Sequence, residues 1–160
     1  MEQNESSGTQ MEIRNISGGA LIQDIDGKRI DRNSWTVVTE KTPTLEQFDD
    51  LAFAWTTVKH VKSNAIVLAK NNQLLGMGSG QPNRLNSIHL AVRAAGDSSS
   101  GSVLASDAFF PFPDSIDVFG KFGVKAIIQP GGSVKDDEVI KRANKYKIAM
   151  AFTNMRHFKH

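Results

Sequence analysis

Three loops carry the residues whose types and spacing could bind a ligand. The first is Gly76–Arg84 (GMGSGQPNR), whose glycines let backbone N–H groups approach a ligand and whose arginine could hold a phosphate or carboxylate. Gln81 stands where the third glycine of a dinucleotide-binding fingerprint would be, so the loop is no such fingerprint. A plain flexible turn is the other interpretation of this loop, and the sequence alone favours it.

The second loop, Pro130–Ser133 (PGGS), lies between an expected strand and an expected helix, where backbone N–H groups favour an anion. Capping of that helix by Ser133 or Asp136 is the simpler interpretation. The third loop, Ser106–Asp114 (SDAFFPFPD), contains three phenylalanines, which are costly to expose to water. It either packs into the core or walls a pocket for a planar ring, and the sequence favours neither.

The sequence gives little support for a metal site or for a thiol nucleophile. The chain has no cysteine, which excludes disulfides, thiol nucleophiles and thiolate metal sites. His157 and His160 are three residues apart, but we expect them on a terminal tail without a carboxylate nearby, so we predict no metal site. His60 follows Lys59 within an expected helix and is offset from its apolar stripe, which indicates a solvated face.

The composition is that of one globular domain. The chain has 160 residues, of which 39% are hydrophobic and 22% charged, and its net charge of +2 is too small to indicate nucleic-acid binding. We find neither a signal peptide nor an apolar run of the ~18 residues that a membrane helix needs, so we expect a cytoplasmic protein that binds no membrane. From Lys135 to His160, seven Lys/Arg stand against three Asp/Glu, which would suit an anionic small ligand.

Two helices are predicted clearly. Thr44 and Gln47 have the spacing of a capping box, and apolar residues follow them at three- and four-residue steps, which predicts a helix that ends near Ser63. A second apolar stripe predicts a helix over Leu85–Ala95, with Gly96 as its stop.

A two-residue hairpin is predicted at Asn71-Asn72, because asparagine tolerates positive φ and the segments Ala65–Lys70 and Gln73–Gly78 on either side are strand-like. Later elements alternate between strand and helix, which favours parallel strands joined by right-handed crossovers. The other expected strands are Ala20–Asp24, Trp35–Thr39, Val103–Ser106, Ala126–Gln129 and Ile148–Thr153, and the other helices lie near Ser115–Phe122 and Asp136–Lys145.

Together these elements predict an α/β protein, a three-layer α/β/α sandwich with a mixed sheet. In such sheets ligands bind beyond the carboxyl ends of the strands, where we expect the three loops. Residues 1–15 are predicted to form a flexible arm or linker remnant, and residues 16–160 the folded subdomain.

Four stretches resemble one known family: VKSNAIV at 61–67, ASDAFFPF at 105–112, IQPGGS at 128–133 and RHFKH at 156–160. On these motifs the chain, over about residues 16–160, resembles the C-terminal part of the bifunctional purine-biosynthesis protein, AICAR formyltransferase/IMP cyclohydrolase. The AICAR transformylase of that family transfers a formyl group from 10-formyltetrahydrofolate to 5-aminoimidazole-4-carboxamide ribonucleotide (AICAR).

The resemblance implies a cytidine-deaminase-like fold, with this chain as the second of two related transformylase halves. It also implies that the zinc chemistry of deaminases is absent, and the sequence agrees, because a deaminase site needs cysteine ligands. The implied function is de novo purine biosynthesis, as part of a formyltransferase and without a cyclohydrolase domain in this chain.

The resemblance further implies roles for individual residues. Those that would contact AICAR are Asn64, which would orient the substrate at the reaction centre, and Arg84, Phe109, Arg156 and His160. Those that would contact 10-formyltetrahydrofolate, a co-substrate, are Leu85, Asp114, Ser133 and Val134. Pro113 departs from the family, because related sequences usually have arginine there, and this loss of a cation beside Asp114 would weaken folate binding.

The AICAR amine is a poor nucleophile, so formyl transfer needs a base for its proton and a donor for the developing oxyanion. In the family a Lys-His pair does this work, in a segment upstream of the part that this chain resembles. Lys59-His60 is not that pair, because it directly precedes Lys62-Ser63-Asn64 and lacks the proline-containing segment that follows the family's pair. We therefore expect this chain alone to be inactive.

Two functions remain open. One is the substrate-binding C-terminal part of AICAR transformylase, with the Lys-His pair supplied by another segment or chain. The other is a non-catalytic nucleotide- or folate-binding module, or an assembly partner. The expected partners are AICAR, 10-formyltetrahydrofolate and either a second copy or a chain that carries the first transformylase half, because the family places its active sites across a dimer interface.

Overall fold

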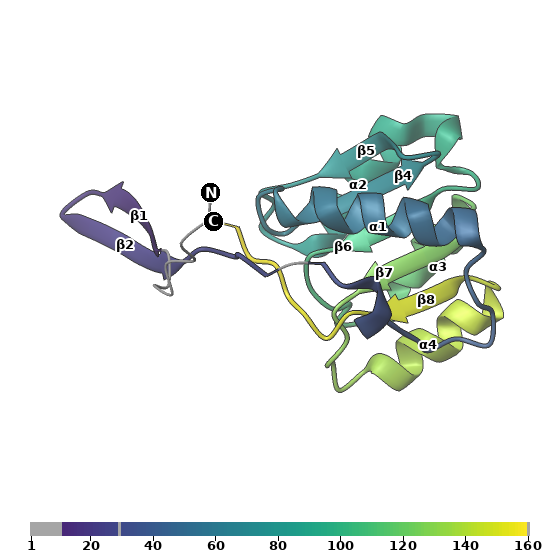
Figure 1. Ribbon diagram of the computed structural model, residues 1–160. Helices are drawn as coiled ribbons and strands as arrows, with labels where there is room; N and C mark the ends of the chain where they lie inside the picture. The colour runs from purple at the N-terminus through teal and green to yellow at the C-terminus, as the bar shows by residue number, and fades with distance from the viewer. Residues whose placement is uncertain (1–10, 29, 160) are drawn as a thin grey trace, which may run out of the picture.

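A six-stranded sheet forms the centre of the protein, in a computed structural model that describes residues 11–28 and 30–159 (Figure 1). Its strands are β3 (Thr36–Val37), β4 (Ile66–Lys70), β5 (Gln73–Gly78), β6 (Val103–Ser106), β7 (Ala126–Gln129) and β8 (Ala149–Phe152). Their order across the sheet is β3-β8-β7-β6-β4-β5. β7 is parallel to both β6 and β8, whereas β4 is antiparallel to β5 and β6, and β3 is antiparallel to β8. The predicted mixed sheet is confirmed.

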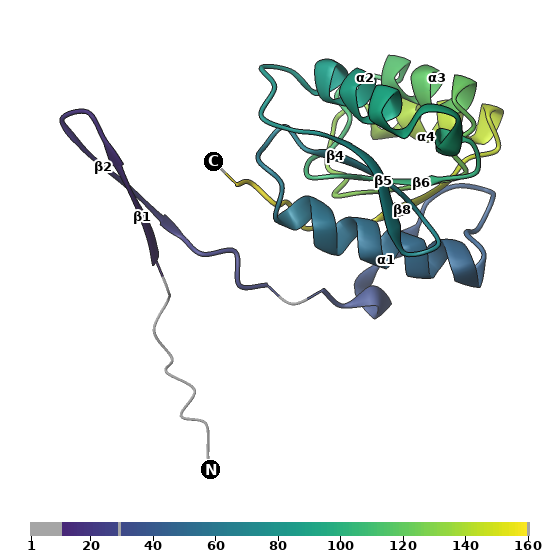
Figure 2. The same ribbon diagram turned by 90° about the horizontal axis from the view of Figure 1, so that it is seen from above.

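Helices cover both faces of this sheet: α1 (Leu45–Lys59), α2 (Arg84–Ala95), α3 (Asp114–Lys121) and α4 (Asp136–Lys145). α1 lies on one face, and α2, α3 and α4 lie on the other (Figure 2). The predicted three-layer α/β/α sandwich is therefore confirmed. Among the described residues, no helix combines the length and the apolar character that crossing a membrane requires.

The two faces of the sheet differ in side-chain size, because alternate residues of a strand point to opposite faces. The face toward α2, α3 and α4 carries mostly large side chains, including Ile66, Leu68, Leu104, Ile127 and Met150. The face toward α1 is rich in alanine, with Ala65, Ala69, Ala105, Ala126, Ala149 and Ala151. One helix can therefore approach this face closely and bury the large side chains of Leu51 and Trp55 against it.

Local signals set several element boundaries as the sequence predicts, although α1 ends at Lys59 and not near Ser63. Thr44 Oγ1 accepts a hydrogen bond from the Gln47 N–H at 3.2 Å, and Gln47 Oε1 accepts from the Thr44 N–H at 3.0 Å, which completes the capping box of α1. Asn71 and Asn72 have φ values of 53° and 54° in the hairpin turn. Gly96, at φ 54°, follows the last residue of α2.

Two glycines of the first loop belong to β5 and pack against α2. A Cβ atom built on Gly76 would lie 2.2 Å from the carbonyl oxygen of Ala91, and one built on Gly78 would lie 2.0 Å from that of Ser87. β5 can approach α2 this closely only because these two residues have no side chain. The expectation that these glycines free backbone N–H groups for a ligand is therefore wrong, and so is a flexible turn at these two positions.

A two-stranded hairpin lies apart from the layered body (Figures 1 and 2). It pairs β1 (Met11–Ile16) with β2 (Gly19–Asp24) in antiparallel register. The strand predicted at 20–24 is confirmed, but residues 11–15 of the predicted flexible arm form its partner, because Ile13 faces Ile22 across the ladder. The rest of the predicted arm, residues 1–10, lies outside the described residues. Large exposed side chains on this hairpin are Met11, Ile13, Ile16, Leu21 and Ile22.

The strand predicted at 35–39 is shorter in the structure, where only Thr36–Val37 belong to β3. The Val38 N–H still donates to the carbonyl oxygen of Met150, at 3.0 Å. Thr39 then uses its side chain instead of its backbone, because its Oγ1 accepts from the Met150 N–H at 2.7 Å. The sequence pattern does not distinguish these two kinds of hydrogen bond.

Replacing Gly78 by alanine tests the close packing of β5 on α2. The new methyl group would meet backbone atoms, so the helix must move, and we expect Gly78→Ala to lower the free energy of unfolding by about 1–3 kcal/mol. Gln73→Ala is the control, because Gln73 is an exposed residue of the same strand. Urea unfolding followed by tryptophan fluorescence measures both, and equal midpoints for the two variants would contradict the packing role.

Candidate functional site

Strand direction brings several segments to one edge of the sheet. β6, β7 and β8 all end there, because they are parallel. β4 begins there, because it is antiparallel to β6 with Ile66 opposite Ser106. The loop before α2 reaches the same edge, where Asn64 Nδ2 donates to the carbonyl oxygen of Gln81 at 3.0 Å. Polar residues at these strand ends therefore lie close together.

Arg84 organises the first part of the candidate site. Its Nη1 donates to a carboxylate oxygen of Asp107 and, at 3.2 Å, to Ser106 Oγ. Its Nη2 donates to Asn64 Oδ1 at 3.1 Å. Since Asn64 Nδ2 donates to Gln81, the amide of Asn64 is held at both ends. The guanidinium group therefore fixes the orientation of the Asn64 side chain.

The ion pair between Arg84 and Asp107 is buried, with side-chain exposures of 10% and 1%. The other carboxylate oxygen of Asp107 accepts a hydrogen bond from Ser63 Oγ at 2.7 Å. Buried charges are tolerated when they are paired and fully hydrogen-bonded, as here. The Ser63–Asn64 peptide bond that leads into β4 is cis.

Arg156 and Phe109 form the second part of the site. The guanidinium carbon of Arg156 lies 4.6 Å from the centroid of the Phe109 ring, in cation–π geometry. Arg156 is exposed, whereas Phe109 is half-buried. A Cβ built on Gly132 would lie 4.0 Å from Arg156 Nη2, so the glycine loop borders the same guanidinium group.

Short main-chain links join the two parts. Phe109 follows Asp107 by two residues, and the N–H of His157, next to Arg156, donates to the carbonyl oxygen of Asp107 at 3.1 Å. The structure thus brings together at one edge four side chains that the resemblance assigns to AICAR: Asn64, Arg84, Phe109 and Arg156. His160, the fifth, lies outside the described residues.

The four residues that the resemblance assigns to folate belong to loops and helix starts. Leu85, Asp114 and Val134 are exposed, and Ser133 is half-buried. Val134 is 99% exposed, so its side chain makes almost no contact with the rest of the chain. These side chains are accessible to a ligand but do not form an enclosed pocket by themselves.

Asp136 ties the glycine loop to the start of α4. Its Oδ2 accepts from the N–H groups of Gly132 and Ser133, at 2.7 and 3.1 Å. The predicted capping of this helix by Ser133 or Asp136 is wrong, because Lys135 is its N-cap, no side chain caps the helix, and the bonded N–H groups lie upstream of it. The N–H groups of Gly132 and Ser133, which could have bound an anion, are therefore already hydrogen-bonded to Asp136. This weighs against an anion site on this loop.

The three phenylalanines of the third loop lie in three environments. Phe110 is fully buried, against Phe119 at 5.4 Å between ring centroids, while Phe112 is exposed. Phe109 alone faces Arg156. Neither prediction for the whole loop is right, because one ring belongs to the core, one to the candidate site and one to the surface.

His157 lies on the predicted C-terminal tail, but its side chain is buried against the body. It is 1% exposed, its ring centroid lies 4.7 Å from that of Trp55, and its Nδ1 is hydrogen-bonded to Asp26. The expectation of no carboxylate nearby is therefore wrong. Asp26 is 131 residues away in sequence, so only the fold brings the two together.

Sequence reasoning missed Asp107 and Ser63 as parts of the site. Both lie within motifs that carry the family resemblance, but neither received a role. The available signal was an acidic residue directly after the wholly buried strand VLAS. A carboxylate at that position needs a cationic partner, and Arg84 is that partner.

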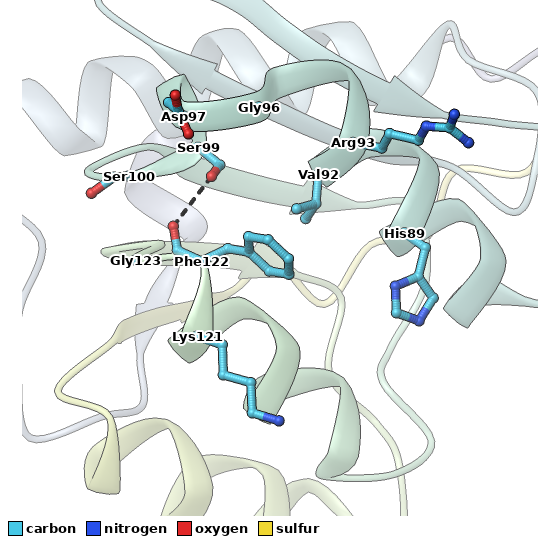
Figure 3. Close-up of a pocket in the computed structure, with 10 residues that line it drawn as sticks. All are labelled: His89, Val92, Arg93, Gly96, Asp97, Ser99, Ser100, Lys121, Phe122 and Gly123. Atoms are coloured by element: carbon cyan, nitrogen blue, oxygen red, sulfur yellow. Dashed lines mark hydrogen bonds between the residues drawn. The ribbon is translucent and has the colours of Figure 1, made fainter.

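A pocket of about 680 Å³ lies elsewhere, between α2, the turn that follows it and the end of α3 (Figure 3). It lies toward the C-terminal end of α2, whereas Arg84 begins that helix. Its basic side chains, His89, Arg93 and Lys121, point in different directions and do not meet at one position. The pocket is therefore separate from the site at the strand ends.

Comparison with known proteins places the chain in a family. The family described as "AICARFT/IMPCHase bienzyme" matches residues 1–94, which is more than half of the chain. The chain belongs to the AICARFT/IMPCHase bienzyme family. Relatives in this family named "Bifunctional purine biosynthesis protein PurH" include those of Desulfitobacterium hafniense (strain Y51), 53% identical over 152 residues, and of Anoxybacillus flavithermus, 54% identical over 148 residues.

These alignments cover 95% and 92% of this chain but only 29% of either relative. The chain thus spans less than a third of the length of the family members that it matches. Similar solved structures include the apo dCMP deaminase of cyanophage S-TIM5, with a TM-score of 0.44 and 18% identity over 64% of this chain and 94% of that one. Form 2 of Acinetobacter baumannii RibD has a TM-score of 0.44 and 16% identity over 66% and 34% of the two chains.

Removing the carboxylate of Asp107 tests the buried ion pair. Asp107→Ala leaves the guanidinium group of Arg84 buried without its counter-charge, which should lower the free energy of unfolding by about 3–5 kcal/mol. Asp49→Ala is the matched control, because it breaks an exposed pair with Arg32 and should change stability by no more than about 1 kcal/mol. Chemical denaturation compares the two, and a small effect at both positions would show that the buried pair is dispensable.

Proposed function

We propose that this chain is the substrate-binding, C-terminal part of an AICAR transformylase and acts in purine biosynthesis. The observation that carries the proposal is the convergence of Asn64, Arg84, Phe109 and Arg156 on one sheet edge, in a member of the AICARFT/IMPCHase bienzyme family. These residues span nearly a hundred positions of the sequence, and only the fold brings them together. Their convergence supports one shared ligand.

The side chains would meet AICAR in different ways. Arg156 is exposed and can direct charge-assisted hydrogen bonds to an anionic group, while Phe109 offers apolar contact to the planar aminoimidazole. Arg84 is nearly buried, and its two terminal nitrogens already bond to Asp107, Ser106 and Asn64. Arg84 would therefore contribute to AICAR binding partly by orienting the Asn64 side chain.

Asn64 would act at the reaction centre by orientation. Its amide has no titratable proton near neutral pH, so it cannot be the base, but it can hold the AICAR amine or polarise a carbonyl. In the transfer, the amine nitrogen bonds to the formyl carbon and loses a proton, the bond from that carbon to N10 of the folate breaks, and N10 takes up a proton to give tetrahydrofolate. The base for that proton would come from a Lys-His pair in another segment or chain.

10-Formyltetrahydrofolate would be bound as co-substrate by Leu85, Asp114, Ser133 and Val134. All four are exposed or half-buried in loops or at helix starts, where a second ligand could reach them. Pro113, beside Asp114, supplies no cation for an anionic part of the folate. We expect this loss of a cation to weaken folate binding relative to related sequences that have arginine at this position.

The exposed apolar side chains of the β1–β2 hairpin favour an interaction with a protein partner. It carries five large exposed apolar side chains and stands away from the body of the chain, which is unusual for a surface that stays in water. One expected partner is the part of the family protein that carries the first transformylase half. A homodimer is the other expected assembly.

Arg156→Ala tests the AICAR site directly. Loss of a hydrogen bond to a charged group should weaken AICAR binding by about 1.5–3 kcal/mol, which is roughly 10- to 150-fold in Kd. Arg93→Ala is the control, because Arg93 is an exposed arginine near the other end of α2. Isothermal titration calorimetry with AICAR gives both values, and equal losses at the two positions would argue against a specific site.

Reconstitution distinguishes the enzyme from the binding module. We expect no formyl transfer by this chain alone, because each missing catalytic group lowers the rate by about 10²–10³. Mixed with a protein that carries the cyclohydrolase domain and the first transformylase half, it should turn over, and Asn64→Ala in the mixture should be slower. A chain that binds AICAR yet gives no turnover in the mixture would instead be the non-catalytic module.

A further inference from the structure

One buried histidine helps to fix the C-terminal tail to the body, together with main-chain hydrogen bonds such as that from the Ser63 N–H to the carbonyl oxygen of Lys159, at 2.9 Å. His157 packs its ring on Trp55 in the α1 layer, and Nδ1 is hydrogen-bonded to Asp26. Its other ring nitrogen, Nε2, is buried and has no hydrogen-bond partner among residues 11–28 and 30–159. Asp26 is therefore the polar contact that sets the orientation of this ring.

Asp26 belongs to the segment that joins the hairpin to the body. It is held there by Lys59 at the end of α1, whose Nζ lies 3.7 Å from Asp26 Oδ1 and donates to the carbonyl oxygen of Lys28 at 2.8 Å. Asp26 thus connects three parts of the chain: the segment after β2, the last turn of α1 and the C-terminal tail through His157. None of these contacts involves the candidate site directly.

The C-terminal tail is fixed on both sides of Arg156. Upstream of Arg156, Thr153 Oγ1 accepts from the Met155 N–H at 3.2 Å and donates to the Met155 carbonyl oxygen at 3.0 Å, which closes a turn after β8. Downstream, the main chain of His157 bonds to Asp107, and its ring bonds to Asp26. Arg156 lies between these two points, with its guanidinium over Phe109.

We propose that Asp26 and His157 form a positioning pair that holds Arg156 over Phe109 in the candidate site. Neither residue would touch substrate. His157 would act through its neighbour Arg156, with its own main chain anchored to Asp107, and Asp26 would act through His157. The part of this inference that concerns AICAR rests on the proposed function, whereas the position of Arg156 does not.

The protonation state of Asp26 suits this role. Burial raises the pKa of the Asp26 carboxyl, but the hydrogen bond and charge of His157 and the charge of Lys59 outweigh it and lower the pKa overall. The carboxylate is therefore ionised at neutral pH, when it accepts from the imidazole. A group with a lowered folded pKa stabilises the fold above its unfolded pKa, and this contribution is lost as pH falls through the folded value.

Nuclear magnetic resonance tests the position of Arg156 without any ligand. The Phe109 ring should shift the δ-methylene protons of Arg156, and Phe109→Leu gives the unshifted reference value. Asp26→Ala should move the shift toward that reference and raise the exchange rate of the His157 amide by about tenfold. Asp24→Ala, at an exposed position two residues away, should do neither. An unchanged Arg156 shift in Asp26→Ala would overturn the proposal.

A double-mutant cycle on AICAR affinity tests the route through Arg156. Asp26→Ala should weaken AICAR binding by about tenfold, and Asp26→Ala with Arg156→Ala should bind no more weakly than Arg156→Ala alone. Asp26→Asn, which keeps an acceptor oxygen, should restore part of the affinity. Additive losses in the double variant would overturn the proposal. If the wild-type chain does not bind AICAR, the proposed function fails, and the Arg156 shift still decides whether the pair positions that side chain.

Discussion

Helices cover the central strands on both faces, and this constraint decides where polar groups can lie. Nearly every residue of β4, β6, β7 and β8 is buried, so hydrogen-bonding side chains gather at the strand ends. The antiparallel pairing of β4 with β6 then places Asn64 beside Asp107. With no water to solvate it, Asp107 requires a cation, and Arg84 at the start of α2 supplies it. The candidate site is thus also the place where the buried charges of Asp107 and Arg84 are paired.

Short-range chemistry explains what could be predicted from the sequence. The capping box at Thr44, the Asn71-Asn72 turn and the stop at Gly96 each depend on neighbouring residues, so their patterns are visible without a fold. The alternation of strand and helix likewise predicts the layers. The family motifs selected the loops that carry Asn64 and Phe109.

The rest depends on contacts between distant residues. Arg84 and Asp107 are 23 positions apart, and Asp26 and His157 are 131 apart, so no local pattern links them. Ile13 pairs with Ile22 across a hairpin whose apolar residues remain exposed, and the sequence predicted only the second of its two strands. Gly76 and Gly78 have the composition of a ligand loop, and only the position of α2 shows that they serve packing.

Because the hairpin projects from the layered body, we expect the chain to have two regions of different thermal stability. A two-stranded hairpin alone is marginally stable in water, and its amides can exchange through local opening while the layers stay intact. Trp55 belongs to α1 and is buried in the core, and Trp35 packs against the same cluster, so their fluorescence reports on the layered body. A melting curve recorded in this way would pass over the loss of the hairpin, and a single melting temperature would not describe the whole chain.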